Sequence, residues 1–224
     1  MPLPIHIQKI WPQTALSAVL LMLLGAAGAA GAAGTWEKVK VTDDGIAVYS
    51  RTTSGTTVRE VRARMTIDAP AKMVFEAVCD PATFGDTTKK YVEKNLFYHI
   101  GDPNVWYNYQ LLNIPVIAKR DYCLRYEKIV TPQKGFFVIT WHASNQFGPP
   151  PQEGIVRLSN IKGRIEVAAD RYGNRTTVRY TLLADPGGNI PTWLINFANR
   201  RSLPDILRQI QDASLARVKQ RAGK

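Results

Sequence analysis

The run of residues 185–197, DPGGNIPTWLINF, constrains the fold of this chain more than any other stretch. Its Pro-Gly-Gly at 186–188 favours a turn, because glycine adopts backbone conformations that other residues avoid, and Pro191 suits the first position of a helix. An alternating strand pattern precedes the run, and apolar residues at helical spacing follow it. The run therefore predicts a sharp corner between a last strand and a final helix, whose apolar face must pack on another apolar surface.

The rest of the chain from Trp36 reads as one α+β domain. Two alternating strands at 46–51 and 58–67 precede a helix, for which Asp68 is a suitable cap and Pro70 lies near the first position. Val74, Phe75 and Val78 form the buried stripe of this helix. Six further strands follow with no helical period between them, at 91–100, 105–112, 120–130, 136–142, 155–168 and 176–183. Together they predict a curved antiparallel sheet, which either curls around its own side chains or encloses a cavity.

Composition excludes some classes of partner. The chain has 224 residues and a formal net charge of +11, and its basic residues are spread along the sequence without a run of five or six like charges. A nucleic-acid partner is therefore not indicated, whereas transient contact with an anionic membrane surface is. The alternative is that the basic surface serves solubility. We expect a monomer.

Residues 1–34 have the layout of a secretory signal peptide. A short start containing Lys9 precedes an apolar stretch and then a tract of alanine and glycine with Ala-x-Ala sites. We therefore expect export, to the periplasm or the medium, and a mature domain spanning 35–220. The alternative is an uncleaved membrane anchor, because Thr14 to Gly34 is about long enough to span a bilayer. The small residues of its second half contribute little transfer energy, which favours cleavage.

No motif for catalysis, metal or cofactor binding is present. Beyond the leader, the histidines are His99 and His142, and there is no G-x-S-x-G, H-E-x-x-H or glycine-rich phosphate loop. Cys79 and Cys123 form no C-x-x-C and have no histidine at ligand spacing. We predict no metal site, no cofactor and no enzyme, and the sequence leaves open whether the two cysteines are bridged.

The D-P-G-G-x-I-P-x-W-L-I-N run closely resembles the last strand, corner and final helix of START (StAR-related lipid-transfer) domains. Three other segments agree in order: Arg-Asp-Tyr at 120–122, Gly-Ile-Val-Arg at 154–157, and Pro204 inside the final helical region. The resemblance extends from about Trp36 to about Ala213. It implies a helix-grip fold, in which an antiparallel sheet wraps a long C-terminal helix around a hydrophobic cavity, in an exported member of bacterial type.

The resemblance also implies a function and a gate. The function is binding, and transfer, of one hydrophobic ligand such as a lipid, sterol or fatty acid. The loop at 113–119 is apolar where polar residues are usual, and in the family this loop covers the cavity against the last helix. Ile114, Val116 and Ile117 are thus expected to touch both ligand and membrane. The alternative is an ordinary buried loop.

For the walls of the cavity we expect aromatic and apolar side chains from the final helix and from strand 105–112. Alternation puts Trp106 on one face of that strand and Tyr107 and Tyr109 on the other. We favour the two tyrosines as the inward pair, because their hydroxyls can meet a headgroup. The wall residues expected on the final helix are Trp193, Leu194 and Phe197.

Tyr126 stands where several family members carry a cavity arginine, six residues after the arginine of the Arg-Asp motif. Arg125 has the opposite strand parity, so the resemblance favours a less charged ligand. Arg120 and Asp121 must point to opposite faces, and we expect them, like Arg157, to pair with loop or helix-end groups. The alternative function is that of a helix-grip cyclase or aromatase acting on a hydrophobic substrate, with tyrosine, histidine or aspartate as acid and base.

Overall fold

The computed structural model describes residues 33–84, 91–115, 117–131, 134–188 and 190–223. The expected leader, residues 1–34, therefore lies outside the described residues except for its last two. The side chains of Trp193, Leu194 and Phe197 are also outside the described part, although the helix backbone there is described.

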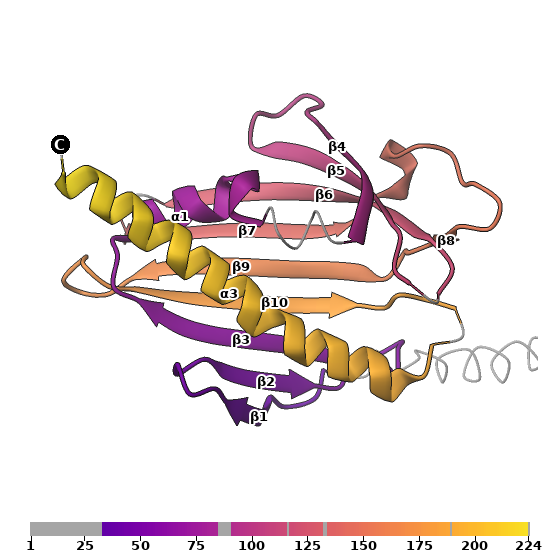
Figure 1. Cartoon of the computed structure of the whole chain (residues 1–224), viewed down its shortest axis with the longest axis horizontal. Coiled ribbons are helices and arrows are strands. Elements are labelled where there is room, and N and C mark those ends of the chain that lie inside the picture. The colour runs from indigo at the N-terminus through magenta and orange to yellow at the C-terminus, as the bar shows by residue number, and fades with distance from the viewer. Residues whose placement is uncertain (1–32, 85–90, 116, 132–133, 189, 224) are drawn as a thin grey trace, which may run out of the picture. The chain divides into compact units, whose positions relative to one another are not determined.

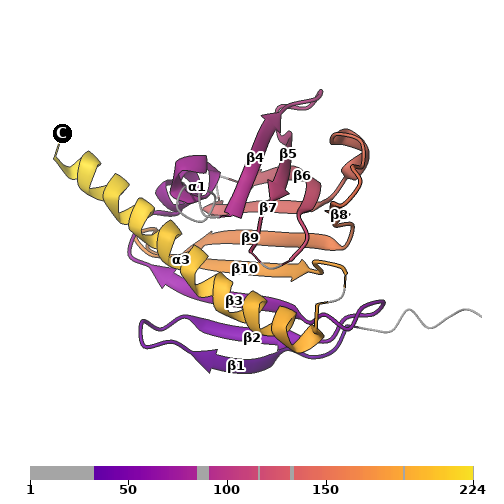
Figure 2. The same cartoon turned by 45° about the vertical axis from the view of Figure 1, so that its right-hand side comes forward.

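A ten-stranded curved sheet forms the body of the domain (Figure 1). Its order is β1-β2-β3-β10-β9-β7-β6-β5-β4, with all neighbours on this path antiparallel, and the short β8 pairs in parallel with β6. The strands rotate from one edge of the sheet to the other, so that β4 and β5 run at a steep angle to β1–β3, most clearly in Figure 2. The strands are β1 (Glu37–Val41), β2 (Ala47–Arg51), β3 (Glu60–Ile67), β4 (Val92–Tyr98), β5 (Val105–Leu112), β6 (Arg120–Thr131), β7 (Phe136–Ala143), β8 (Val156–Arg157), β9 (Ile161–Ala169) and β10 (Thr176–Ala184).

The long helix α3 (Thr192–Ala222) crosses one face of the sheet diagonally, and α1 (Ala71–Cys79) lies on the same face (Figures 1 and 2). We call this the inner face and the opposite one the outer face. Leu203, Leu207 and Ile210 of α3 are fully buried in the main core, together with the inward residues of β3. Pro204 lies inside α3, as the resemblance implied. The described residues also contain the short 3-10 helices η1 (Pro81–Phe84) and η3 (Asn145–Phe147).

The α+β helix-grip architecture expected from the sequence is confirmed, with three local corrections. The single strand expected at 155–168 is two strands, β8 and β9, because Leu158 to Asn160 leave the ladder between them. The strand β1 was not expected, since its alternating run from Lys38 to Val41 is short and all five of its residues are exposed.

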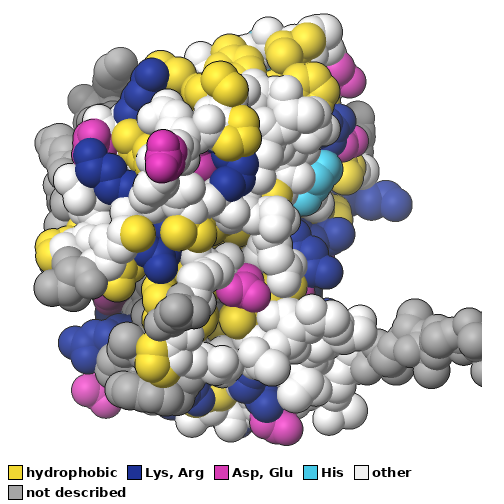
Figure 3. Space-filling view, turned by 90° about the vertical axis from the view of Figure 1, so that its right-hand side faces the viewer, with side chains coloured by type: hydrophobic (Ala, Val, Ile, Leu, Met, Phe, Trp, Pro, Cys, Tyr) yellow, Lys and Arg dark blue, Asp and Glu magenta, His cyan; other side chains and the backbone are white. Residues whose placement is uncertain are grey.

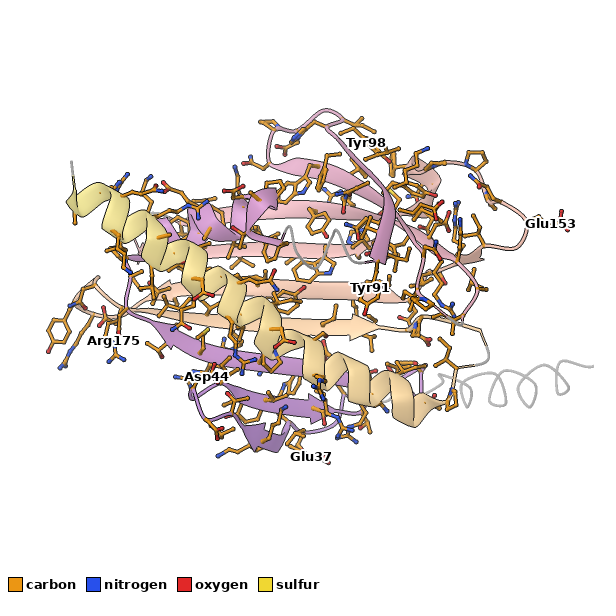
Figure 4. All side chains as sticks on the ribbon, viewed as in Figure 1. Glu37, Asp44, Tyr91, Tyr98, Glu153 and Arg175 are labelled. Atoms are coloured by element: carbon orange, nitrogen blue, oxygen red, sulfur yellow. The ribbon has the colours of Figure 1, made fainter. Side chains whose placement is uncertain are left out.

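Helix α1 also begins differently from the expectation. Its N-cap is Pro70, without a side-chain cap, and Asp68 instead accepts a 2.8 Å hydrogen bond from Nε of Arg175. Arg175 projects from the β9–β10 turn at the far end of the sheet (Figure 4). Val74 and Val78 are buried as expected, while Phe75 is half-buried and stacks on Phe137. Among the described residues, none of the helices is long and apolar enough to cross a membrane.

Candidate ligand-binding site

Four aromatic side chains from four strands form a continuous row on the inner face. Trp106 of β5 stacks on Tyr126 of β6 with ring centroids 5.2 Å apart, and Tyr126 lies 5.7 Å from Trp141 of β7. Trp141 in turn meets Tyr180 of β10 edge-on at 5.2 Å. We call these four residues the aromatic row. Offset and edge-on contacts of this kind are favourable beyond the area that they bury.

Gly163 explains how the row crosses from β7 to β10. In the sheet, β9 lies between these two strands, and Gly163 is the direct partner of Trp141. A Cβ atom at Gly163 would lie 2.2 Å from Cζ2 of Trp141, so any side chain there would collide with the indole. A glycine in the middle of a strand often marks such a close approach. Here it leaves the space through which Trp141 reaches Tyr180.

Neutral polar groups lie beside the aromatic row. The Tyr122 hydroxyl donates a hydrogen bond to Oε1 of Gln110, and Nδ2 of the buried Asn108 donates to Oδ1 of Asn95 over 2.6 Å. Burial raises the pKa of Tyr122, Tyr126 and Tyr180, so these phenols stay protonated at neutral pH. Even so, the three tyrosines and Trp106 are only half-buried.

Tyr126 thus faces the helix, but the two tyrosines of β5 that we expected there do not. Tyr107 and Tyr109 pair with Arg125 and Cys123 on the outer face. The prediction that Tyr107 and Tyr109 share one face of β5, opposite Trp106, was correct. The prediction that this face points towards the helix was wrong. Tyr107 packs against Phe147 of η3 with ring centroids 4.6 Å apart, since the segment 144–155 covers this end of the outer face. The outer set of β5, which includes Tyr107 and Tyr109, is fully buried by this cover, whereas the helix-facing set includes Asn108, Gln110 and the half-buried Trp106. The apolar set of the strand therefore packs under the covering segment rather than against the helix.

The gate region is described in part. Ile114 and Ile117 of the 113–119 loop are half-buried, and the amide of Ile117 donates to the carbonyl of Ile114 over 3.5 Å. Val116 lies outside the described residues, as do the side chains of Trp193, Leu194 and Phe197. The loop lies at the same end of the sheet as the corner that leads into α3 (Figure 1).

Arg120 ties this loop to the corner, which confirms its expected pairing with loop groups. Its side chain is 4% exposed, and its guanidinium donates to the carbonyl of Pro186 over 3.1 Å and to that of Ala118. Burial lowers the pKa of Arg120. Gly187 and Gly188 have φ values of 60° and 69°, which few other residues adopt, so the two glycines let the chain turn while the Pro186 carbonyl faces the arginine.

Asp121, the next residue, points to the outer face and forms a buried ion pair. Its carboxylate is 1% exposed and accepts Nε of Arg157 over 2.9 Å and the Tyr109 hydroxyl over 3.1 Å. Arg157 also donates to the Pro149 carbonyl over 2.9 Å, which fastens the 144–155 segment. The sequence indicated that Arg120 and Asp121 would diverge, but carried no signal for the pairing of Asp121 with Arg157.

The two histidines and two cysteines of the described residues lie outside the aromatic row. His99 follows β4 and contacts the Val105 carbonyl through Nδ1 at 3.0 Å, and His142 is exposed on the outer face. Within the described part of the chain, no group of three or more histidine, cysteine, aspartate or glutamate residues could hold a metal ion. Cys79 and Cys123 are both free thiols, and Cys123 Sγ lies 3.1 Å from the hydroxyl of Tyr98 (Figure 4).

Comparison with known proteins finds one family. The model of the START domain family matches residues 22–221. Among curated proteins, phosphatidylcholine transfer protein of Bos taurus is 31% identical over 65 residues, which cover 29% of this chain and 30% of that protein. The Rattus norvegicus protein of the same name is 30% identical over 102 residues, covering 43% of this chain and 46% of that protein. The chain spans less than half the length of these curated relatives.

Solved structures share the fold. A STAR-related lipid transfer protein fragment from Xanthomonas axonopodis superposes with a TM-score of 0.66 at 23% identity, covering 80% of this chain and 98% of that one. Human STARD10 gives a TM-score of 0.68 at 16% identity, covering 95% and 84% respectively. At these identities the likeness concerns the arrangement of the sheet and the helix.

Proposed function

This chain belongs to the START domain family, and from that membership we propose that it binds, and transfers, one hydrophobic ligand between α3 and the inner face of its sheet. The names of its relatives support this proposal, since the curated matches are phosphatidylcholine transfer proteins. The observation that carries it is the aromatic row. Tyr126 and Tyr180 face the helix with strongly desolvated hydroxyls and are nevertheless only half-buried, as expected for side chains that line an internal space.

The proposed binding is driven by removal of apolar area from water. A long-chain lipid buries several hundred Å² of apolar surface, which at the usual coefficient stabilises the complex by on the order of 10 kcal/mol. Desolvation also makes each hydrogen bond to the ligand depend strongly on geometry. A ligand that matches the tyrosine hydroxyls is therefore preferred over a hydrocarbon of the same length.

The groups beside the aromatic row support a ligand with an uncharged polar end. Tyr122, Gln110 and Asn108 are neutral, and Tyr126 occupies the position where several family members carry an arginine. The buried Arg120 is already bonded to two backbone carbonyls. We therefore propose a sterol, a protonated fatty acid or another neutral lipid.

The first test is the ligand itself. Native mass spectrometry of the full chain, purified without detergent from its source, should show a discrete mass excess that extracts into organic solvent. Denaturing conditions should then return the mass of the bare chain. If the protein carries no excess and takes up nothing from a mixture of sterols, fatty acids and phospholipids, the proposal fails.

For release, we propose that the 113–119 loop separates from the corner and α3 at a membrane. Figure 3 faces this end of the molecule, where apolar side chains lie among lysine and arginine side chains. Such a surface supports contact with anionic headgroups while an apolar loop enters the interface. The Arg120 contacts with Ala118 and Pro186 must then loosen.

Replacing Ile117 by aspartate tests this gate. We expect Ile117→Asp to slow transfer of a fluorescent sterol or fatty acid between vesicles by about tenfold, because a charge in the loop opposes entry into the interface. Ile129→Asp is the matched control, since Ile129 is a 48% exposed isoleucine on β6. Equal transfer rates for the two variants, with both folded and loaded, would contradict the gate.

Export through residues 1–34 is a separate part of the proposal. Signal peptidases cut after small residues, and residues 25–34 consist of alanine and glycine. N-terminal sequencing of the protein from its source should begin within or just after this tract. An intact Met1 on a membrane-bound protein would instead support the anchor.

A further inference from the structure

The outer face carries a basic groove that the lipid-binding proposal does not use. It has a volume of about 530 Å³ and crosses β2, β3, β10, β9 and β7. Two carboxylates, Glu60 and Glu166, lie among its walls. The positively charged side chains of the groove number five, so it has a formal excess of three positive charges. They are Arg51, Arg62, Lys162, Arg164 and Arg179.

The register of the strands places like charges next to one another on the face that carries this groove. Arg179 of the groove lies directly opposite the exposed Arg64 of β3, which is outside the groove's lining, and Glu166 of β9 is its partner on the other side. Like charges directly opposite on neighbouring strands are destabilising. A folded protein keeps such an arrangement at a cost in stability, which is typical of a binding surface rather than of a scaffold.

Both glutamates are already engaged by other arginines. Glu60 accepts Nε of Arg51 over 2.6 Å. Glu166 accepts Arg164 over 3.0 Å and Arg179 over 2.8 Å. The two carboxylates therefore neutralise part of the groove, and among the described residues they leave Arg62 and Lys162 without an ion-pair partner.

Of these two cations, Arg62 is the more buried. Its Nε donates to Oγ1 of Thr181 over 3.3 Å, and its guanidinium carbon lies 3.9 Å from the centre of the Trp36 ring. Among the described residues, no carboxylate lies within ion-pair distance of Arg62. Burial, followed by the nearby charges of Arg179 and Arg51, lowers its pKa. The lowered pKa agrees with the geometry, because the Arg62 guanidinium is partly withdrawn from water and lies near other cations.

We propose that this groove binds an anion bearing two or more acid groups, such as a phosphorylated headgroup or a soluble phosphate compound. Planar guanidinium groups donate paired hydrogen bonds to phosphate and carboxylate oxygens, and several arginines around one space favour a ligand with several such oxygens. Trp36, which also lies 4.5 Å from the guanidinium of Arg51, forms an apolar wall beside the site. The charged side chains of the groove point to the face opposite the aromatic row, and of that row Trp141 alone also lines the groove. The proposal therefore does not rest on the lipid-binding function.

Inorganic pyrophosphate is the first probe. Titration calorimetry at low salt should show binding to the full chain, and the double variant Arg62→Gln with Arg179→Gln should weaken it by about tenfold or more, because two charge-assisted contacts are lost. The matched control is the double variant Arg171→Gln with Arg175→Gln, which removes two charges at the β9–β10 turn outside the groove. We expect that control to change the affinity by less than about twofold. Equal losses in both double variants, or none in either, would overturn the proposal.

The variants must be shown to fold. Circular dichroism and thermal midpoints should match the wild type, since neither glutamine leaves a buried carboxylate without an arginine partner. A second variant, Lys162→Gln, changes an exposed residue of the groove and should weaken pyrophosphate binding by a few-fold on its own. Unchanged binding in a folded Lys162→Gln protein would count against the site.

Vesicles decide the source of the anion. Sedimentation with phosphatidylcholine vesicles that contain phosphatidic acid, a phosphomonoester with two ionisable oxygens, should fall for the groove variant if the occupant is a lipid headgroup. Pyrophosphate should then displace the wild type from these vesicles. If the occupant is a soluble phosphate compound, vesicle binding should stay the same while pyrophosphate affinity falls. Ligand loading measured by mass spectrometry should be equal in wild type and groove variant. This last readout separates the groove from the lipid-binding proposal.

Discussion

The two faces of the sheet use the same strands for different purposes. Along β10, Val178 and Tyr180 face α3, whereas Arg179 and Thr181 face away from it. The inner face is apolar and aromatic because a helix covers it, and the outer face is basic where it is open to water. Alternation therefore separates the two environments, and what covers each face decides which kind of residue is stable there.

Coverage also divides the outer face into two parts. Under the 144–155 segment, Asp121 and Arg157 are held in a buried pair together with Tyr109. In the open groove, Arg62 and Arg179 keep their charge near water. The same residue types thus form a buried structural pair where a loop covers them and a partly exposed basic surface where none does.

The largest effect should come from breaking the covered pair. Asp121→Ala leaves the Arg157 guanidinium largely buried without its carboxylate, and it also removes the acceptor of the Tyr109 hydroxyl. We expect a loss of about 3–5 kcal/mol in the free energy of unfolding. Urea denaturation against the wild type measures it.

The matched change in the open groove is Arg179→Gln, which removes a charge from a pair that stays partly in water. Its effect on stability should lie within about 0.5 kcal/mol. If Asp121→Ala cost no more than Arg179→Gln, burial under the 144–155 segment would not be what distinguishes the two parts of the outer face.

A smaller effect should follow from filling the space over Gly163 on the inner face. Gly163→Val forces the Trp141 indole away from its position over β9 and separates it from Tyr180. Overpacking of this kind costs about 1–3 kcal/mol, which a thermal or urea melt would detect. The variant should also bind its lipid more weakly, because the aromatic row is interrupted.

Gly223→Ala is the control for that change. A Cβ atom at Gly223 would meet only the Lys219 carbonyl oxygen, at 3.6 Å, so stability and ligand binding should stay unchanged. A stable Gly163→Val protein with normal lipid uptake would show that the row is not needed as a unit.

The sequence predicted the features of the fold that local chemistry determines. The Pro-Gly-Gly corner, the final helix and the divergence of Arg120 from Asp121 follow from turn chemistry and from strand period. The edge strand β1 was missed although lysine and valine alternate from Lys38 to Val41, because the run is short and none of its residues is buried. It pairs with β2 at the edge of the sheet.

Parts of the site required the tertiary structure. Strand period shows that Tyr107 and Trp106 point in opposite directions, but only the covering segment at 144–155 shows which of them faces the helix. The groove likewise joins residues from five strands whose order in the sheet differs from their order in the chain. Arg62 and Thr181 are 119 positions apart and still hydrogen-bonded, and no pattern within one segment could predict that contact.

The smallest effect should come from an ion pair that stays in water. Asp44, in the turn before β2, accepts Nε of Arg208 on α3 over 2.8 Å. The hydrogen bond from Arg208, and next that from Thr42, lower the pKa of Asp44 from 3.8 to about 2. Because the folded pKa lies below the unfolded one, the pair stabilises the fold fully above about pH 4, and the contribution disappears as the pH falls towards and below 2.

Both side chains are about 40% exposed, so the contribution at neutral pH should be only about 0.5 kcal/mol. Urea midpoints of the wild type and of Asp44→Asn should therefore differ slightly at pH 6 and converge as the pH approaches 2. A difference that widened on acidification would contradict the lowered pKa. A difference as large as that of Asp121→Ala would mean that exposure to water does not weaken the Asp44–Arg208 pair relative to the buried Asp121–Arg157 pair. The contrast between covered and open charges would then fail.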